Sequence, residues 1–173
     1  MLYLQLVLLG LMNVKKLNIE ELEDDNVYLF AIHTTLEDYR LAYFLNRELN
    51  IQLCKANHDL KIVTNRGSSE FTLFNYEDEV NFANWDLIQN KAEIHDNITS
   101  TTYDLFSIEK KSIQSRVYLV PEYKKADYIL KVTIPEHVIS ISNLTTQVQS
   151  IKKVSTAYEV DFYTIKSKNN LIF

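Results

Sequence analysis

Glycine is scarce in this sequence, which has two glycines, Gly10 and Gly67, and two prolines in 173 residues. Loops that cradle a phosphate need several glycines close together, because backbone N–H groups must approach the phosphate oxygens. Two glycines this far apart build no such loop. The sequence therefore argues against P-loop and dinucleotide-binding folds, and we expect no nucleotide and no other cofactor.

Cysteine is nearly absent as well. Cys54 is the single cysteine, so the chain forms no intramolecular disulfide, and a reducing cytoplasm is the expected compartment. Cys54 has no partner for a CxxC pair and the four histidines show no HExxH spacing, so we expect no metal. Because Leu53-Cys54 lies in a strand-like run, we expect a buried, inert thiol.

Positive charge is in deficit, with 18 Lys and Arg against 23 Asp and Glu and a net charge of -5. Affinity for nucleic acid comes from clustered bases that neutralise phosphates, so nucleic acid is not the expected partner. Residues 70–86 carry acids and no base, whereas residues 109–131 are rich in bases. We interpret the two stretches as solvated faces, with a basic patch for an acidic partner as the alternative.

A long apolar run is also missing. The apolar start MLYLQLVLLGLMN is too short to span a bilayer and lacks the basic region and cleavage site of a signal peptide. We interpret residues 1–11 as an over-extended start or leader before Met12; an extra β-strand or docking segment and a membrane or export signal are the alternatives. Residues 12–173 then form a single domain, and no membrane association is expected.

Aromatic side chains are plentiful, with 11 Tyr and 8 Phe, and they favour strands. The run VYLFAIH at residues 27–33 predicts a buried strand. Thr34 and Glu37 have the spacing of a capping box. They predict that a helix follows the strand, with an apolar stripe over residues 41–49.

Short strand-like runs follow the first helix: IQLCKA, LKIVT, FTLFNYE, residues 82–94, SIQSRVYLV and YILKV. Gly67 supplies the positive φ that a hairpin turn after LKIVT needs. A polar linker at residues 96–103 separates the two halves of the chain. Successive strands joined by short turns favour antiparallel neighbours.

A second helix is predicted over residues 143–158, because apolar residues recur at helical spacing from Leu144 to Tyr158. The ending FYTIKSKNNLIF predicts a strand, a polar turn and an apolar end. We expect Leu171, Ile172 and Phe173 to be buried there. Together the elements predict an α+β fold in which two amphipathic helices pack on an antiparallel sheet of several strands.

Residues 120–128, VPEYKKADY, carry a family resemblance. They resemble the motif of the IPExxxVDY family, a group of uncharacterised bacterial proteins typical of Bacteroidetes. Val120 replaces the Ile and Ala126 replaces the Val of that motif, so apolar character is kept. The ending IKSKNNLIF is similar to the usual end of the family. The resemblance covers residues 12–173 and implies no catalytic role for any residue.

The residues of this motif predict a structural role. Pro121 suits the first position of a helical turn, where Glu122 meets the positive end of the dipole. Asp127 can accept backbone N–H groups where the chain enters a strand, and Tyr128 begins an apolar face of that strand. A paired-carboxylate site from Glu122 and Asp127 and a partner-binding surface are the alternatives.

No catalytic constellation emerges from the sequence. We therefore expect a non-enzymatic protein-interaction or regulatory domain whose partner is a protein. The alternative is an enzyme whose site assembles from scattered Asp, Glu, His and Tyr residues. Self-association is left open.

Overall fold

The protein is an antiparallel sheet with helices on one side. The computed structural model describes residues 25–64, 67–94, 116–135 and 140–173. Six antiparallel strands form the main sheet in the order β10-β1-β9-β6-β5-β2. In chain order these strands are β1 Asp25–Thr34, β2 Cys54–Lys55, β5 Leu73–Asp78, β6 Ala83–Gln89, β9 Tyr128–Pro135 and β10 Val154–Val160. The α+β fold and the antiparallel sheet predicted from the sequence are confirmed.

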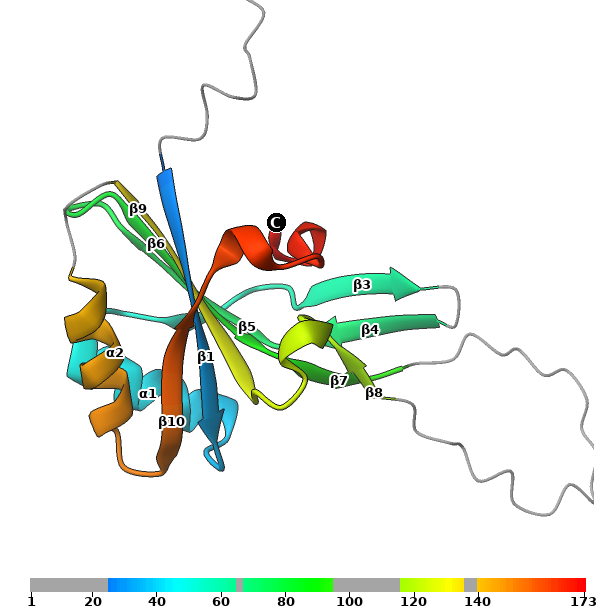
Figure 1. The fold of residues 1–173 in the computed structure, drawn as a ribbon, viewed down its shortest axis with the longest axis horizontal. Helices are drawn as coiled ribbons and strands as arrows, with labels where there is room; N and C mark the ends of the chain where they lie inside the picture. The colour runs from blue at the N-terminus through cyan, green and yellow to red at the C-terminus, as the bar shows by residue number, and fades with distance from the viewer. Residues whose placement is uncertain (1–24, 65–66, 95–115, 136–139) are drawn as a thin grey trace, which may run out of the picture.

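Both helices cover the same face of the sheet (Figure 1). They are α1 Asp38–Leu49 and α2 Ile141–Ser150. Leu41 and Leu45 of α1 and Leu144 of α2 pack in one core cluster with every second residue of the strands, including Phe30 and Leu130. Tyr128 and Val132 belong to the same cluster, as the strand alternation predicted.

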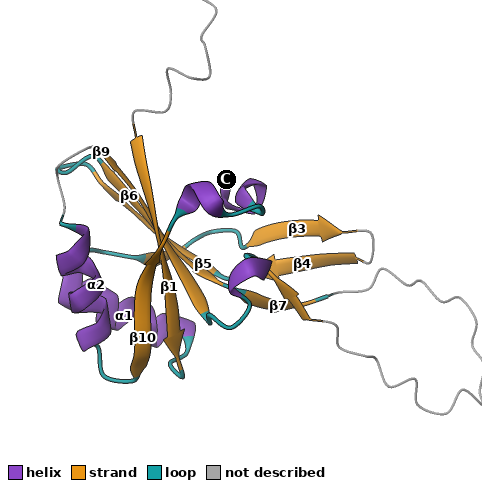
Figure 2. Ribbon diagram, viewed as in Figure 1, coloured by secondary structure: helices purple, strands orange, loops and turns teal. Residues whose placement is uncertain are grey.

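The second face of the sheet is covered by hairpins and by the C-terminal segment (Figures 1 and 2). The hairpins pair β3 Leu60–Thr64 with β4 Gly67–Phe71, and β7 Lys91–Glu93 with β8 Arg116–Tyr118. Gly67 has φ 151 and begins β4 opposite Thr64, in agreement with its predicted hairpin position. Because both faces of β1 are covered, its sequence is a continuous apolar run and does not alternate between apolar and polar residues.

The first helix starts without the predicted capping box. It begins at Asp38 after Glu37, whose side chain makes no capping hydrogen bond. Thr34 is the last residue of β1; its hydroxyl accepts a hydrogen bond from the Leu36 N–H and donates one to the Lys153 carbonyl. The prediction was wrong because strand pairing extends through Thr34 and uses its side chain to fix the turn.

The predicted helix over residues 143–158 was too long. The helix α2 ends at Ser150, and residues 154–160 form the edge strand β10 beside β1. Positions four apart lie on one side of a helix and also on one side of a strand. Val154 and Tyr158 therefore fit either structure, and pairing with β1 decides between them.

The C-terminal segment contains two short 3₁₀ turns, Phe162–Thr164 and Lys168–Leu171, in place of the predicted strand. Leu171 is buried as expected. Ile172 and Phe173 are 73% and 49% exposed, so the expectation that all three terminal side chains are buried was wrong for these two. Of the last three residues, Leu171 is the one that packs in the core, in the same cluster as Ile165. The predicted strand at residues 51–56 is reduced to the two residues of β2.

Residues 1–11, Met12 and the linker at 96–103 lie outside the described residues. The expectations about them remain predictions.

Candidate functional site

The motif at residues 120–128 forms a junction between segments that are distant in the sequence. Pro121 is at the start of the 3₁₀ turn Pro121–Tyr123, as predicted. Val120 and Ala126 are fully buried in the cluster that covers the second sheet face. The two positions that differ from the family motif are therefore core positions, where apolar character is what matters.

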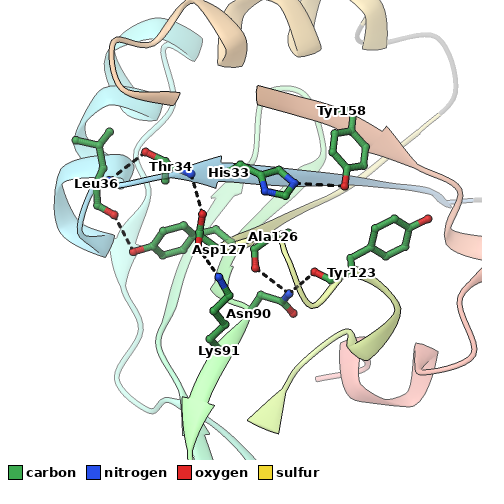
Figure 3. A network of polar contacts seen from close by, with 10 residues as sticks. His33, Thr34, Leu36, Asn90, Lys91, Tyr123, Ala126, Asp127 and Tyr158 are labelled. Atoms are coloured by element: carbon green, nitrogen blue, oxygen red, sulfur yellow. Dashed lines mark hydrogen bonds and ion pairs between the residues drawn. The ribbon is translucent and has the colours of Figure 1, made fainter. Parts of the chain in front are cut away.

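A buried amide holds this turn in place. The Asn90 side chain is fully buried. Its Oδ1 accepts a hydrogen bond from the Val120 N–H at 2.9 Å. Its Nδ2 donates to the carbonyls of Tyr123 at 2.9 Å and Ala126 at 3.1 Å (Figure 3). Sequence reasoning missed Asn90, because its partners are main-chain groups about 30 residues away that no local pattern reveals.

Asp127 connects three strands at the same junction. Its Oδ2 accepts a hydrogen bond from the Thr34 N–H at 2.9 Å, and its Oδ1 lies 2.6 Å from Nζ of Lys91 (Figure 3). The expected backbone N–H acceptor role of Asp127 is therefore confirmed. Next to it, the Tyr128 hydroxyl donates to the Leu36 carbonyl at 3.1 Å. Burial, with smaller contributions from nearby carboxylates, raises the pKa of Tyr128 to about 12.

Glu122 binds a different part of the chain. Its carboxylate accepts hydrogen bonds from the N–H groups of Lys166 and Ser167 and from the Ser167 hydroxyl, at 2.7 to 3.0 Å. Partial desolvation raises the pKa of Glu122, but hydrogen bonds from its own backbone N–H, from the Ser167 hydroxyl and from the N–H groups of Lys166 and Ser167 together outweigh it and keep the pKa below its usual value. Glu122 thus ties the C-terminal segment to the junction, and it shares no hydrogen-bond partner with Asp127. The geometry gives no support to a paired-carboxylate site.

A second charged pair lies beneath the C-terminal segment. Nζ of Lys131 is 3.6 Å from Oδ2 of Asp86, and both side chains are only 14% exposed. Lys131 also donates to the Leu171 carbonyl at 3.0 Å. Burial raises the pKa of Asp86, and the charge of Lys131 opposes that rise. The interpretation of the acidic and basic stretches as solvated faces was therefore wrong for these two residues.

The two described histidines, His33 and His58, differ in their surroundings. His33 stacks on Tyr158 and its Nε2 is 3.4 Å from the Tyr158 hydroxyl, whereas His58 is exposed in a loop. Cys54 is exposed on β2, so the expected burial of its thiol was wrong. The strand is too short and too close to the sheet edge to cover it.

Within the described ranges, no group of three or more His, Cys, Asp or Glu side chains is arranged to hold a metal ion. None of the helices in those ranges is long and apolar enough to cross a membrane.

The tip of the β5–β6 hairpin exposes two large apolar side chains. Val80 and Phe82 are 85% and 77% exposed. Phe82 also has a positive φ of 52, a conformation that is rare for bulky residues. The Asp78 carboxylate accepts hydrogen bonds from the N–H groups of Val80 and Asn81 and from the Asn81 side-chain amide. The tip is therefore held in one shape with its apolar side chains outward.

A cleft of about 250 Å³ lies beside this tip, between the end of α1, the middle of α2 and the hairpin. Its lining residues are Leu49, Asn50, Ile51, Asp78, Asn81, Trp85, Leu144 and Gln147. Trp85 is 3% exposed, and its indole nitrogen has no hydrogen-bond partner among the described residues. The tip and the cleft together form the candidate functional site.

Known protein families, curated proteins and solved structures give no match to this chain. The resemblance of residues 120–128 to the IPExxxVDY motif therefore stays a prediction.

Proposed function

We propose that this chain is a non-enzymatic protein-interaction domain that contacts a partner protein through the tip of the β5–β6 hairpin. The observation that carries the proposal is the exposed ring of Phe82 on a left-handed backbone. The motif resemblance supports a bacterial protein of the IPExxxVDY type, and the single cysteine supports a cytoplasmic location.

The conformation of Phe82 works against folding. A left-handed backbone costs about 1–2 kcal/mol for a residue with a Cβ, and glycine or asparagine occupies it more readily. Because the ring is 77% exposed, its burial in the domain returns little of that free energy. Strained residues cluster at functional positions, and exposed aromatic side chains are enriched in protein interfaces. A partner that covers the ring accounts for both properties.

Two substitutions at this position separate strain from contact. Phe82→Gly removes the ring and the strain, whereas Phe82→Ala removes the ring and keeps most of the strain. We expect both variants to lose the proteins that the wild type captures from host extract. We also expect Phe82→Gly to be more stable than Phe82→Ala by about 1 kcal/mol, measured by urea denaturation.

Val63→Ala is the matched control, because Val63 is 75% exposed on the β3–β4 hairpin, away from the β5–β6 tip (Figure 1). It should capture the same proteins as the wild type. Unchanged capture by both Phe82 variants would refute the contact role of the tip.

A further inference from the structure

The outer side of α1 presents a stripe of tyrosine and arginine side chains. Tyr39, Arg40, Tyr43 and Arg47 recur three and four positions apart, on the side of the helix opposite its buried residues. We call these four residues the α1 stripe. Tyr39 and Tyr43 are 59% and 62% exposed, and the Arg47 side chain is 57% exposed. Tyr and Arg are enriched at the centres of protein interfaces, so the stripe has the composition of a contact surface.

The arginines of the α1 stripe are available to an acidic partner. Arg40 forms no ion pair with a described residue. Arg47 pairs with Glu48 at the surface, and exposed pairs of this kind contribute little to stability, so Arg47 can exchange its partner at low cost. Glu37 and Asp38 lie at the start of the helix, away from the end that carries Arg47.

The hairpin tip carries the opposite charge. Asp78 and Glu79 directly precede Val80 in the tip, and residues 70–86 contain acids and no base. Glu79 is exposed and forms no ion pair with a described residue. The tip therefore presents negative charge beside the exposed apolar side chains of Val80 and Phe82.

The α1 stripe and the tip are neighbours on the surface. Leu49 and Asn50, at the end of α1, line the same cleft as Asp78 and Asn81 of the tip. A twofold axis beside this cleft places the tip of each copy against the α1 stripe of the other. An interface with this symmetry uses the same surface on both copies and closes at a dimer. The opposite charges and the exposed aromatic side chains of the two surfaces are complementary in this arrangement.

We propose that the partner of the hairpin tip is a second copy of this chain, and that the two copies form a twofold dimer. The Phe82 ring of each copy packs against Tyr39 and Tyr43 of the other. Glu79 pairs with Arg47 across the interface. This proposal rests on the proposed interaction function and identifies the partner at the same site.

Sedimentation of the full-length protein over a range of concentrations tests the dimer. We expect a reversible equilibrium between monomer and dimer, with a dissociation constant between about 1 and 100 µM. Arg47→Glu places like charges opposite each other and should raise this constant at least about tenfold, and Glu79→Arg should do the same from the other side. Lys61→Glu is the matched control, because it reverses an exposed charge on β3, away from the β5–β6 tip (Figure 1); it should leave the constant unchanged.

Mixing the two reversed variants separates a lost contact from a damaged fold. In a mixed dimer of Arg47→Glu and Glu79→Arg, one contact has the wild-type charges and the other has both charges exchanged, so both contacts are attractive. The mixture should therefore dimerise with a constant within about threefold of the wild type. A wild type that stays monomeric at about 500 µM, reversed variants that dimerise like the wild type, or a mixture that stays monomeric each overturn the proposal.

Dimerisation and capture also separate this proposal from the proposed function. A monomeric wild type whose captured host proteins are lost in Phe82→Gly supports the contact role of the tip and refutes the second copy as its partner. Loss of the dimer in both Phe82→Gly and Arg47→Glu supports the two together. A dimer that persists in Phe82→Gly, with unchanged capture, refutes the tip and this dimer with it.

Discussion

At the scale of single residues, the buried Asn90 amide is expected to contribute strongly to stability through its hydrogen bonds. Asn90→Asp keeps the shape of the side chain but replaces the Nδ2 donor with an acceptor beside the carbonyls of Tyr123 and Ala126. We expect it to lower the free energy of unfolding by about 3 kcal/mol or more, because a charge is buried without a donor. Urea denaturation followed by circular dichroism measures this loss.

Asn57→Asp is the control for Asn90→Asp, because Asn57 is exposed between β2 and β3. It should change stability by less than about 0.5 kcal/mol. Equal stability of the two variants would mean that the Asn90 side chain is not buried as described.

Asp127 is predicted to stabilise the same junction. Asp127→Asn removes the ion pair with Lys91 and leaves an amide oxygen that can still accept from Thr34. We expect a loss of about 1–3 kcal/mol, measured as a lower urea midpoint. A variant that melts like the wild type but no longer captures partners would instead make Asp127 part of a binding site.

Some of this junction was predictable from the sequence and some was not. Pro121 at the start of a turn and Asp127 as an N–H acceptor follow from the local chemistry of those residues. Asn90 and the contact of Glu122 with Lys166 and Ser167 do not, because each joins segments brought together only by the fold. The exposed Phe82 was equally hidden, since its φ depends on the loop that Asp78 closes.

At the scale of elements, strand and helix patterns were predictable where only one periodicity fits. β1 and β3 were expected from their β-branched and aromatic runs, and both are strands. The boundary between α2 and β10 was not, because the apolar residues from Leu144 to Tyr158 fit a helix throughout. Pairing with β1 is a long-range interaction that a local pattern does not contain.

The C-terminal segment gives a prediction at this scale. Leu171 is 1% exposed and Ile172 is 73% exposed. Shortening the side chains of these two neighbours should therefore have very different effects on stability. We expect Leu171→Ala to cost about 2–5 kcal/mol, because it leaves a cavity in the second core cluster. Ile172→Ala should cost less than about 0.5 kcal/mol. Denaturation midpoints of the two variants measure the difference, and similar midpoints would mean that Leu171 is not an anchor.

At the scale of the whole molecule, the titration of Tyr128 should account for part of the loss of folding stability at alkaline pH. Its pKa is raised to about 12 in the folded protein, and an unfolded tyrosine titrates at about 10. Between these values the folded state binds more protons than the unfolded state. The contribution of Tyr128 to stability is therefore fully present below pH 10 and is lost as pH rises toward 12.

Tyr128→Phe removes this titration. The stability of the wild type should fall by about 2–3 kcal/mol more than that of the variant between pH 10 and pH 12. At neutral pH the variant should be less stable by about 1 kcal/mol, because the bond to the Leu36 carbonyl is lost. If the stabilities of the two proteins fell in parallel between pH 10 and pH 12, the raised pKa would be contradicted. Other groups that titrate in this range affect both proteins equally, so they cancel in the comparison.

The order of strands in the sheet also determines how long β1 waits during synthesis before its neighbouring strands are made. The strand β1 is flanked by β9 and β10, and Ile32 lies opposite Tyr128 on one side and Ala157 on the other. At about 5–20 residues per second, the ribosome makes β1 roughly 5–20 s before its first neighbour exists. During that time an apolar strand has no partner in its own chain and is prone to aggregation. Yield in the cell should therefore depend on translation speed and on chaperones that cover nascent apolar segments.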